Sequence, residues 1–135
     1  MNSKKKLFIA CGVLVVILGV IIIILAMQDG VNMKMGYVGN NVGNNMNGSF
    51  KYFNGTEEKK VKFEEGSNVV ITYSLNQKAG ELRLTVSDSQ GGLIDSADGT
   101  AEGEFHFTAD KTQKYVITVE AKEAEGSFNI DWEEN

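Results

Sequence analysis

The sequence NVVITYSLNQKAGELRLTVS, residues 68–87, alternates apolar and polar side chains on either side of a polar NQKAG segment. The apolar positions are Val69, Ile71, Tyr73, Leu75, Leu82, Leu84 and Val86. A period of two residues is typical of a β-strand with one buried face. The stretch therefore predicts two strands, 68–76 and 81–88, that pair as a hairpin through the loop 76–80, where Gly80 suits a tight turn.

The same alternation continues on both sides of this stretch. Further short strands are expected at residues 50–53, 59–63, 93–96, 104–108, 115–121 and 128–132. Clusters of Gly, Asn, Asp and Ser separate them, and no window after residue 49 has the pattern of a long amphipathic helix. Residues 49–135 are therefore predicted to form an all-β domain, an antiparallel β-sandwich of about eight strands with a jelly-roll or immunoglobulin-like arrangement.

The phase of the alternation also predicts the core. Trp132 lies in phase with Phe128 and Ile130 on the last strand, and we expect all three to point inward with Leu84 and Ile71. Asp131, one residue away, is expected to face solvent.

An uninterrupted apolar run, LFIACGVLVVILGVIIIILAM, fills residues 7–27 and contains no charged residue. A helix of this length spans about 30 Å, the thickness of the bilayer hydrocarbon. Lys4, Lys5 and Lys6 precede it, and positive charge stays on the cytoplasmic side. The sequence therefore predicts a cytoplasmic stub at 1–6, a single transmembrane helix at 7–27 that contacts the lipid bilayer, and a C-terminal domain outside the cytoplasm.

Two other readings of this run remain open. A signal peptide cleaved after Ala26 would release the domain, although its apolar region is usually shorter. Cys11 follows Phe8-Ile9-Ala10, which loosely resembles a lipobox, so lipidation of Cys11 is the second alternative. Within the helix, Gly12 and Gly19 lie seven residues apart on one face and could contact another transmembrane helix.

Glycine and asparagine dominate the segment after this run. Residues 38–41 read VGNN and are repeated at once as VGNN at 42–45. Both residue types favour turns and lose much chain entropy on ordering. Residues 28–48 are therefore predicted to be a flexible linker.

The final strand, GSFNIDW at residues 126–132, resembles the last strand of small and mostly uncharacterised surface proteins and lipoproteins of Gram-positive bacteria. The segments YVITVE at 115–120 and ELRLTVSD at 81–88 extend the resemblance. It implies a β-sandwich ending in a G-S-F-x-I/V-x-W strand and a surface location, and it transfers no site residue. This chain differs in having a full spanning run where those lipoproteins have a lipobox.

Charge and residue types limit the chemistry. From residue 49 onward there are 17 acidic and 9 basic residues, which argues against binding to nucleic acid. His106, the one histidine, is expected to face solvent, and the one cysteine lies in the predicted membrane segment, so no catalytic site is expected. The weak candidates for a calcium site are Asp88, Asp95, Asp98 and Glu102, and no cofactor is expected.

These observations favour a membrane-anchored, extracytoplasmic β-sandwich that acts as a binding or interaction module at a bacterial cell surface, without catalysis. Its ligand would be an extracytoplasmic protein or a polysaccharide. An accessory or regulatory subunit of a membrane complex is the alternative, and a hydrolase is a remote one.

Overall fold

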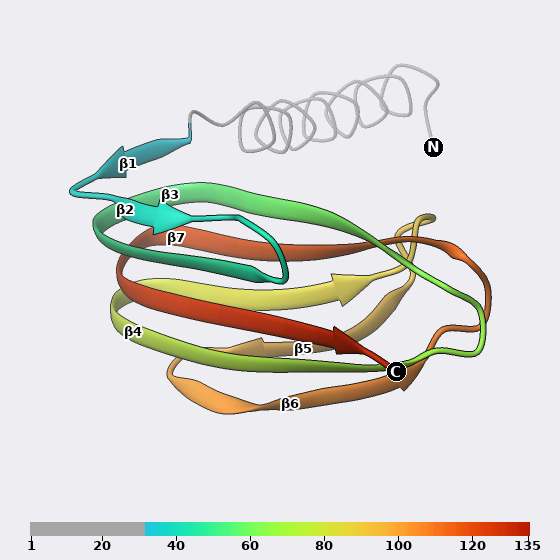
Figure 1. Cartoon of the computed structure of the whole chain (residues 1–135). Coiled ribbons are helices and arrows are strands. Elements are labelled where there is room, and N and C mark those ends of the chain that lie inside the picture. Colours follow the sequence, from blue (N-terminus) through green and yellow to red (C-terminus); the bar gives the residue numbers. More distant parts are fainter. Residues whose placement is uncertain (1–31) are drawn as a thin grey trace, which may run out of the picture. The chain divides into compact units, whose positions relative to one another are not determined.

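Seven antiparallel β-strands make up residues 32–135, the part of the chain that the computed structural model describes (Figure 1). They are β1 (Met33–Met35), β2 (Val38–Asn40), β3 (Asn45–Phe63), β4 (Asn68–Ser87), β5 (Leu93–Asp98), β6 (Ala101–Thr108) and β7 (Gln113–Glu134). The predicted stub, the predicted spanning segment with Cys11, Gly12 and Gly19, and residues 28–31 lie outside the described residues. Within residues 32–135 the structure has no helix able to span a bilayer.

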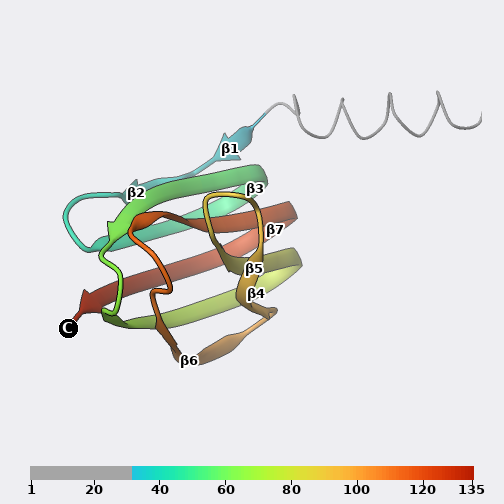
Figure 2. The same ribbon diagram turned by 90° about the vertical axis from the view of Figure 1, so that its right-hand side faces the viewer.

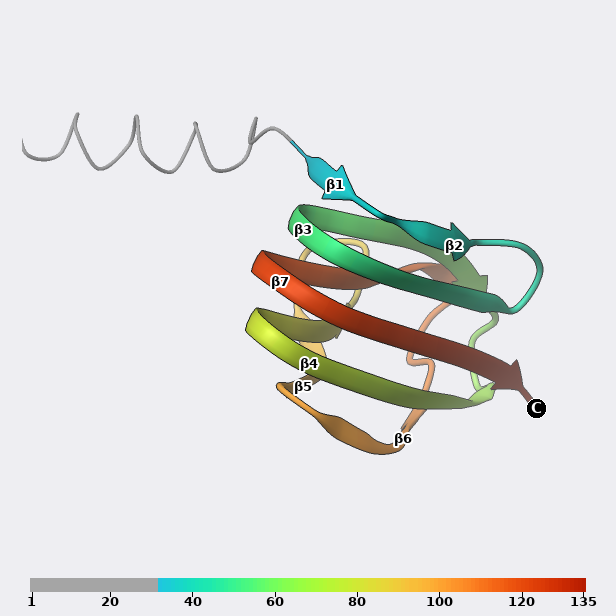
Figure 3. The same ribbon diagram turned by 90° about the vertical axis from the view of Figure 1, so that its left-hand side faces the viewer.

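Three long strands build both layers of the domain. The strands β3, β7 and β4 lie side by side in the order β1-β3-β7-β4-β5, with β2 also on β3 and β6 also on β4. Each long strand curls back over itself, so that its two halves face each other (Figures 2 and 3). The first layer contains residues 45–50, 126–134 and 68–77 with β2 and β6, and the second contains residues 55–63, 113–121 and 81–87 with β5. The all-β antiparallel prediction is confirmed.

The predicted hairpin at residues 68–88 is wrong. Both of its arms belong to the single strand β4, and both pair with β7, Ile71 opposite Trp132 and Leu84 opposite Val119. Residues 76–80 form a bend marked by two register shifts, with Gly80 at a φ of +71°. A polar, glycine-containing segment suits a bend as well as a turn, because both need a residue that tolerates positive φ.

Other strands predicted as separate are also parts of one longer strand, so the structure has fewer long strands than the eight short ones expected. The predicted strands at 50–53 and 59–63 are two parts of β3, and those at 115–121 and 128–132 are two parts of β7. Each pair is one strand that passes from one layer to the other.

The core fills the space between the layers with inward-facing side chains from both. Ile71, Leu84 and Ile130 are fully buried, and Phe128 and Trp132 are each 3% exposed. These five residues therefore point inward, as the alternation in the sequence predicts.

The predicted linker differs from the structure between residues 32 and 48. β1, β2 and the start of β3 lie in this segment, and β1 and β2 run along β3 from Met33 opposite Asn54 to Asn40 opposite Asn47. The repeated VGNN is divided between β2, the turn at 41–44 and the first residue of β3, and Gly43 in the turn has a φ of +63°. Burial of Met46 and packing of Tyr37 against Phe50 offset the entropy lost by these glycines and asparagines.

Tyr37 covers the core at the edge formed by β1 and β2. Its ring stacks on Phe50 with centroids 6.0 Å apart and meets Phe53 edge-on at 5.8 Å. Gly39 and Gly48 are register partners beneath the ring, and a Cβ at Gly48 would lie 2.6 Å from the Tyr37 hydroxyl oxygen. The two glycines therefore make the slot that the ring occupies.

Burial raises the pKa of the Tyr37 hydroxyl above its ordinary value of 10.0. As pH rises, the Tyr37 hydroxyl therefore ionises at a lower pH in the unfolded chain than in the folded one. Its contribution to the free energy of unfolding is fully present below pH 10 and is lost as pH rises through the pKa of the folded state. We expect the free energy of unfolding to fall less between about pH 8 and about pH 11 in Tyr37→Phe than in the unchanged protein, and urea melts at the two pH values measure this difference. Tyr52→Phe is the control, and an equal effect of both variants would contradict this assignment.

Candidate functional site

Two rows of polar side chains cross the outer surface of the first layer. The cross-strand register aligns them, and we call their eight members the amide face. The first row is Asn45, Asp131, Thr72 and Glu104, and the second is Asn47, Asn129, Ser74 and Glu102. Each row spans four strands, or roughly 14 Å at the usual strand spacing. All eight residues are exposed or half-buried, so this surface is open to a ligand.

Side-chain hydrogen bonds connect the two rows. The Asn45 Nδ2 donates to Asn129 Oδ1 at 2.8 Å and to Asp131 Oδ1 at 2.7 Å, and the Asn47 Nδ2 donates to Asn45 Oδ1 at 2.6 Å. These bonds hold the three asparagines in fixed orientations, which lowers the entropy that a ligand contact would cost. Amide groups offer both donors and acceptors, so the face can bind groups of either kind.

Two shallow depressions lie on this surface and share Ser74 and Asn129. One, about 380 Å³, is lined by Thr72, Tyr73, Ser74, Glu102, Gly103, Glu104, Asn129 and Asp131. The other, about 370 Å³, is lined by Val38, Asn47, Gly48, Ser49, Ser74, Ser127, Phe128 and Asn129. Tyr73 and Phe128 also border these depressions, but their rings point inward, since Tyr73 packs against Phe105 with centroids 4.5 Å apart and Phe128 is 3% exposed.

The charges on the amide face are all negative. Asp131, Glu102 and Glu104 are its ionisable members, and none of the eight residues is Lys or Arg. The outer surface of the second layer differs, since it carries Arg83 and Lys122 among acidic residues. The amide face is thus suited to neutral or cationic groups and unsuited to phosphate or carboxylate.

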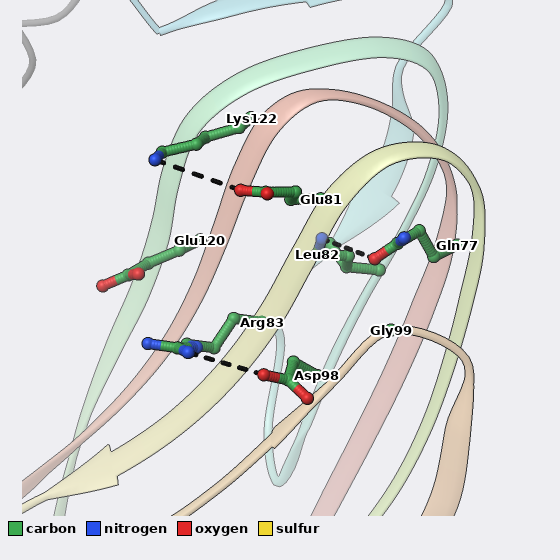
Figure 4. A pocket seen from close by; sticks show the side chains of 8 residues that line it. All are labelled: Gln77, Glu81, Leu82, Arg83, Asp98, Gly99, Glu120 and Lys122. Carbon is green, nitrogen blue, oxygen red and sulfur yellow. Dashed lines mark hydrogen bonds and ion pairs between the residues drawn. The ribbon is translucent and has the colours of Figure 1, made fainter.

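A third depression, about 440 Å³, lies on the outer surface of the second layer beside the bend of β4 (Figure 4). Four of its five charged side chains form cross-strand ion pairs, Arg83 Nη2 to Asp98 Oδ2 at 3.4 Å and Lys122 Nζ to Glu81 Oε2 at 3.9 Å. Gln77 Oε1 accepts a hydrogen bond from the Leu82 amide at 2.9 Å and so supports the bend itself. Exposed pairs of this kind contribute little to stability, and we read the surface as a solvated sheet face.

The predicted calcium candidates do not form a site. Asp88 accepts bonds from the Gln90 and Gly92 amides in its own turn, while Asp98 pairs with Arg83. Asp95 accepts a bond from the next amide, and Glu102 belongs to the amide face. In the described part of the chain, no three His, Cys, Asp or Glu side chains gather closely enough to hold a metal ion. The sequence placed these carboxylates near one predicted strand, but the strands β5 and β6 separate them.

His106 is exposed and its Nε2 lies 2.8 Å from Glu104 Oε2 at the end of the amide face. Its predicted exposure is confirmed. Among residues 32–135 no polar or charged residue is buried.

The predicted linker at 28–48 hides the two members of the amide face that β3 contributes. Asn45, Asn47 and Ser49 alternate with buried Met46 and Phe50, as in a strand with one buried face. That alternation was the available signal, and the adjoining repeat concealed it.

No protein-family model matches the chain, and no curated protein matches it. Similar solved structures include the lysozyme inhibitor PliG of Aeromonas hydrophila, a periplasmic inhibitor of g-type lysozyme, at 16% identity over 76% of this chain and 93% of that chain, with a TM-score of 0.46. The carbohydrate-binding module CBM4 has 10% identity over 78% of this chain and 79% of that chain, with a TM-score of 0.40. TmCBM61, solved with β-1,4-galactotriose, has 18% identity over 73% of this chain and 69% of that chain, with a TM-score of 0.42. These likenesses are distant ones between β-sandwich domains.

Proposed function

We propose that this protein is a non-catalytic binding module whose amide face holds a neutral polysaccharide. The observation that carries the proposal is the pair of aligned rows of amide, hydroxyl and carboxylate groups without a single cation. A polysaccharide presents hydroxyl groups that both donate and accept, and such groups match the side chains of Asn129, Asn47 and Ser74.

A neutral sugar chain would bind through the amides and hydroxyls of the amide face, with no repulsion from its carboxylates. An anionic polymer would instead meet Asp131, Glu102 and Glu104, which repel it. Because the depressions are shallow, we expect a Kd on the order of 0.1 to 1 mM.

The exposed location of His106 and the lack of a buried carboxylate among residues 32–135 support a role in binding rather than catalysis. The uncharged run at 7–27 and the three lysines before it support a place outside the cytoplasm, tethered to the cell membrane.

Asn129→Ala tests the site, because Asn129 lines both depressions. We expect the Kd for a neutral oligosaccharide to rise about tenfold in isothermal titration of the full chain, since a hydrogen-bonding partner of the ligand is removed. A panel of neutral oligosaccharides is titrated first, and oligogalacturonate serves as the anionic comparison.

Thr118→Ala is the matched control. Thr118 is a polar residue of β7 like Asn129, half-buried where Asn129 is exposed, and it pairs with Thr85 in the second layer. We expect it to leave the Kd unchanged. Equal losses in the two variants, or tighter binding of oligogalacturonate than of every neutral sugar, would contradict the proposal.

A further inference from the structure

Exposed apolar side chains concentrate in one short segment of the described chain. The large exposed hydrophobic residues among residues 32–135 are Met33, Met35, Val38, Val42 and Leu93, with exposed fractions of 48, 60, 77, 70 and 66%. Four of these five fall between residues 33 and 42, on β1, β2 and the turn that follows. A cluster of this kind marks an interaction surface more often than scattered single residues do.

The backbone of this segment forms a free edge of the sheet. β1 and β2 keep a continuous register along β3 and pair with no other strand of residues 32–135. Residues 33–42 contain no acidic residue, and their one charged side chain, Lys34, forms an ion pair with Glu57. We call residues 33–42 the β1–β2 edge.

The other edge strands of the sheet are protected by charge. β5 carries Asp95 and Asp98, and β6 carries Glu102 and Glu104. Charged residues on an edge are a common defence against unwanted pairing. The β1–β2 edge lacks this defence, so its apolar surface needs some other cover.

The short distance along the chain between the predicted anchor and β1 indicates what covers this edge. The predicted spanning segment ends at Met27, and Met33 follows six residues later. Six extended residues reach at most about 20 Å, so the β1–β2 edge begins close to the headgroups of the membrane that holds the anchor. The rest of the domain, with 17 acidic and 9 basic residues from residue 49 onward, is repelled by an anionic leaflet.

We propose that the β1–β2 edge rests on the lipid surface, with Met33, Met35, Val38 and Val42 in contact with the bilayer interface. The sheet edge then lies in a region where water still satisfies its free backbone groups, while the apolar side chains leave water. This inference rests on the predicted anchor, and the lipid-facing surface adjoins the amide face at Val38, which also lines one of its depressions.

Two fluorescent labels test it in the full chain. In a Cys11→Ser background, Met35→Cys and Leu93→Cys place an environment-sensitive dye at residues that are 60% and 66% exposed. The proteins are reconstituted in vesicles of phosphatidylcholine and phosphatidylglycerol. We expect lipid-attached quenchers to reduce the signal at residue 35 several-fold more than at residue 93, and aqueous iodide to do the reverse.

The possible results distinguish contact of the β1–β2 edge with lipid from its contact with a second copy of the chain. Protection of residue 35 that stays constant as lipid is added in excess supports the proposal. Protection that disappears on this dilution shows that a second copy covers the edge, which overturns it. Equal iodide access to both labels, or a chain that does not remain with the vesicles, overturns it as well.

Discussion

Trp132→Ala is expected to leave residues 32–135 marginally stable or unfolded. Trp132 is 3% exposed, pairs with Ile71 across the strands and lies with its ring 5.7 Å from the Lys59 Nζ. Truncating a buried Trp costs about 3–5 kcal/mol, and a small domain has only about 5–15 kcal/mol of stability in total. Urea melts followed by circular dichroism give the difference directly.

Asp131→Ala is the control for this variant. Asp131 is the preceding residue, is exposed, and accepts one hydrogen bond from Asn45 at 2.7 Å. Its loss should cost about 1 kcal/mol or less. If the two variants exchanged their effects, the inward phase of β7 would be shifted by one residue and the assignment of the amide face would be wrong with it. The fragment used must begin at residue 32, because a later start removes β1 and β2.

Gly80→Ala is expected to be comparably severe, because the bends of β4 and β7 touch at this point. A Cβ on Gly80 would lie 2.2 Å from the Glu123 carbonyl oxygen and 2.4 Å from that of Lys122. Both are backbone atoms, which cannot move away as the end of a side chain can. We expect a loss of several kcal/mol in the free energy of unfolding, since backbone strain and a steric clash add.

Gly66→Ala separates those two contributions. Gly66 has a φ of +83°, close to the +71° of Gly80, but nothing lies within 4 Å of its Cβ position. It should therefore show the strain alone, about 1 kcal/mol. Equal losses at Gly66 and Gly80 in the same urea melts would mean that the bends of β4 and β7 do not pack against each other.

The sequence predicted which side chains are buried better than it predicted which strands are neighbours. The alternation through Leu84, Ile71 and Ile130 depends on local phase alone, and the structure buries all three. Whether residues 76–80 turn back or bend over depends on which strand the second half meets. That partner, β7, lies far away in the chain, so local residues carry no information about it.

The candidate site was hidden for the same reason. The hydrogen bond from Asn45 to Asp131 joins residues separated by 86 positions, and only the register of β3 and β7 brings them together. Residues 32–48 were predicted to be a linker because glycine and asparagine disfavour strands when taken alone. Burial of Met46 and Phe50 in the same strand outweighs that preference.

The side-chain amide signals of the asparagines give the most direct test of the proposed binding surface. In a nuclear magnetic resonance titration of the ¹⁵N-labelled protein with a neutral oligosaccharide, we expect the NH₂ signals of Asn45, Asn47 and Asn129 to move together and to saturate. The NH₂ signal of Gln113, whose side chain binds Ser89 at the far end of the second layer, should stay in place. Movement at Gln113 without movement at the three asparagines, or no movement with any neutral sugar at millimolar concentration, would contradict the account.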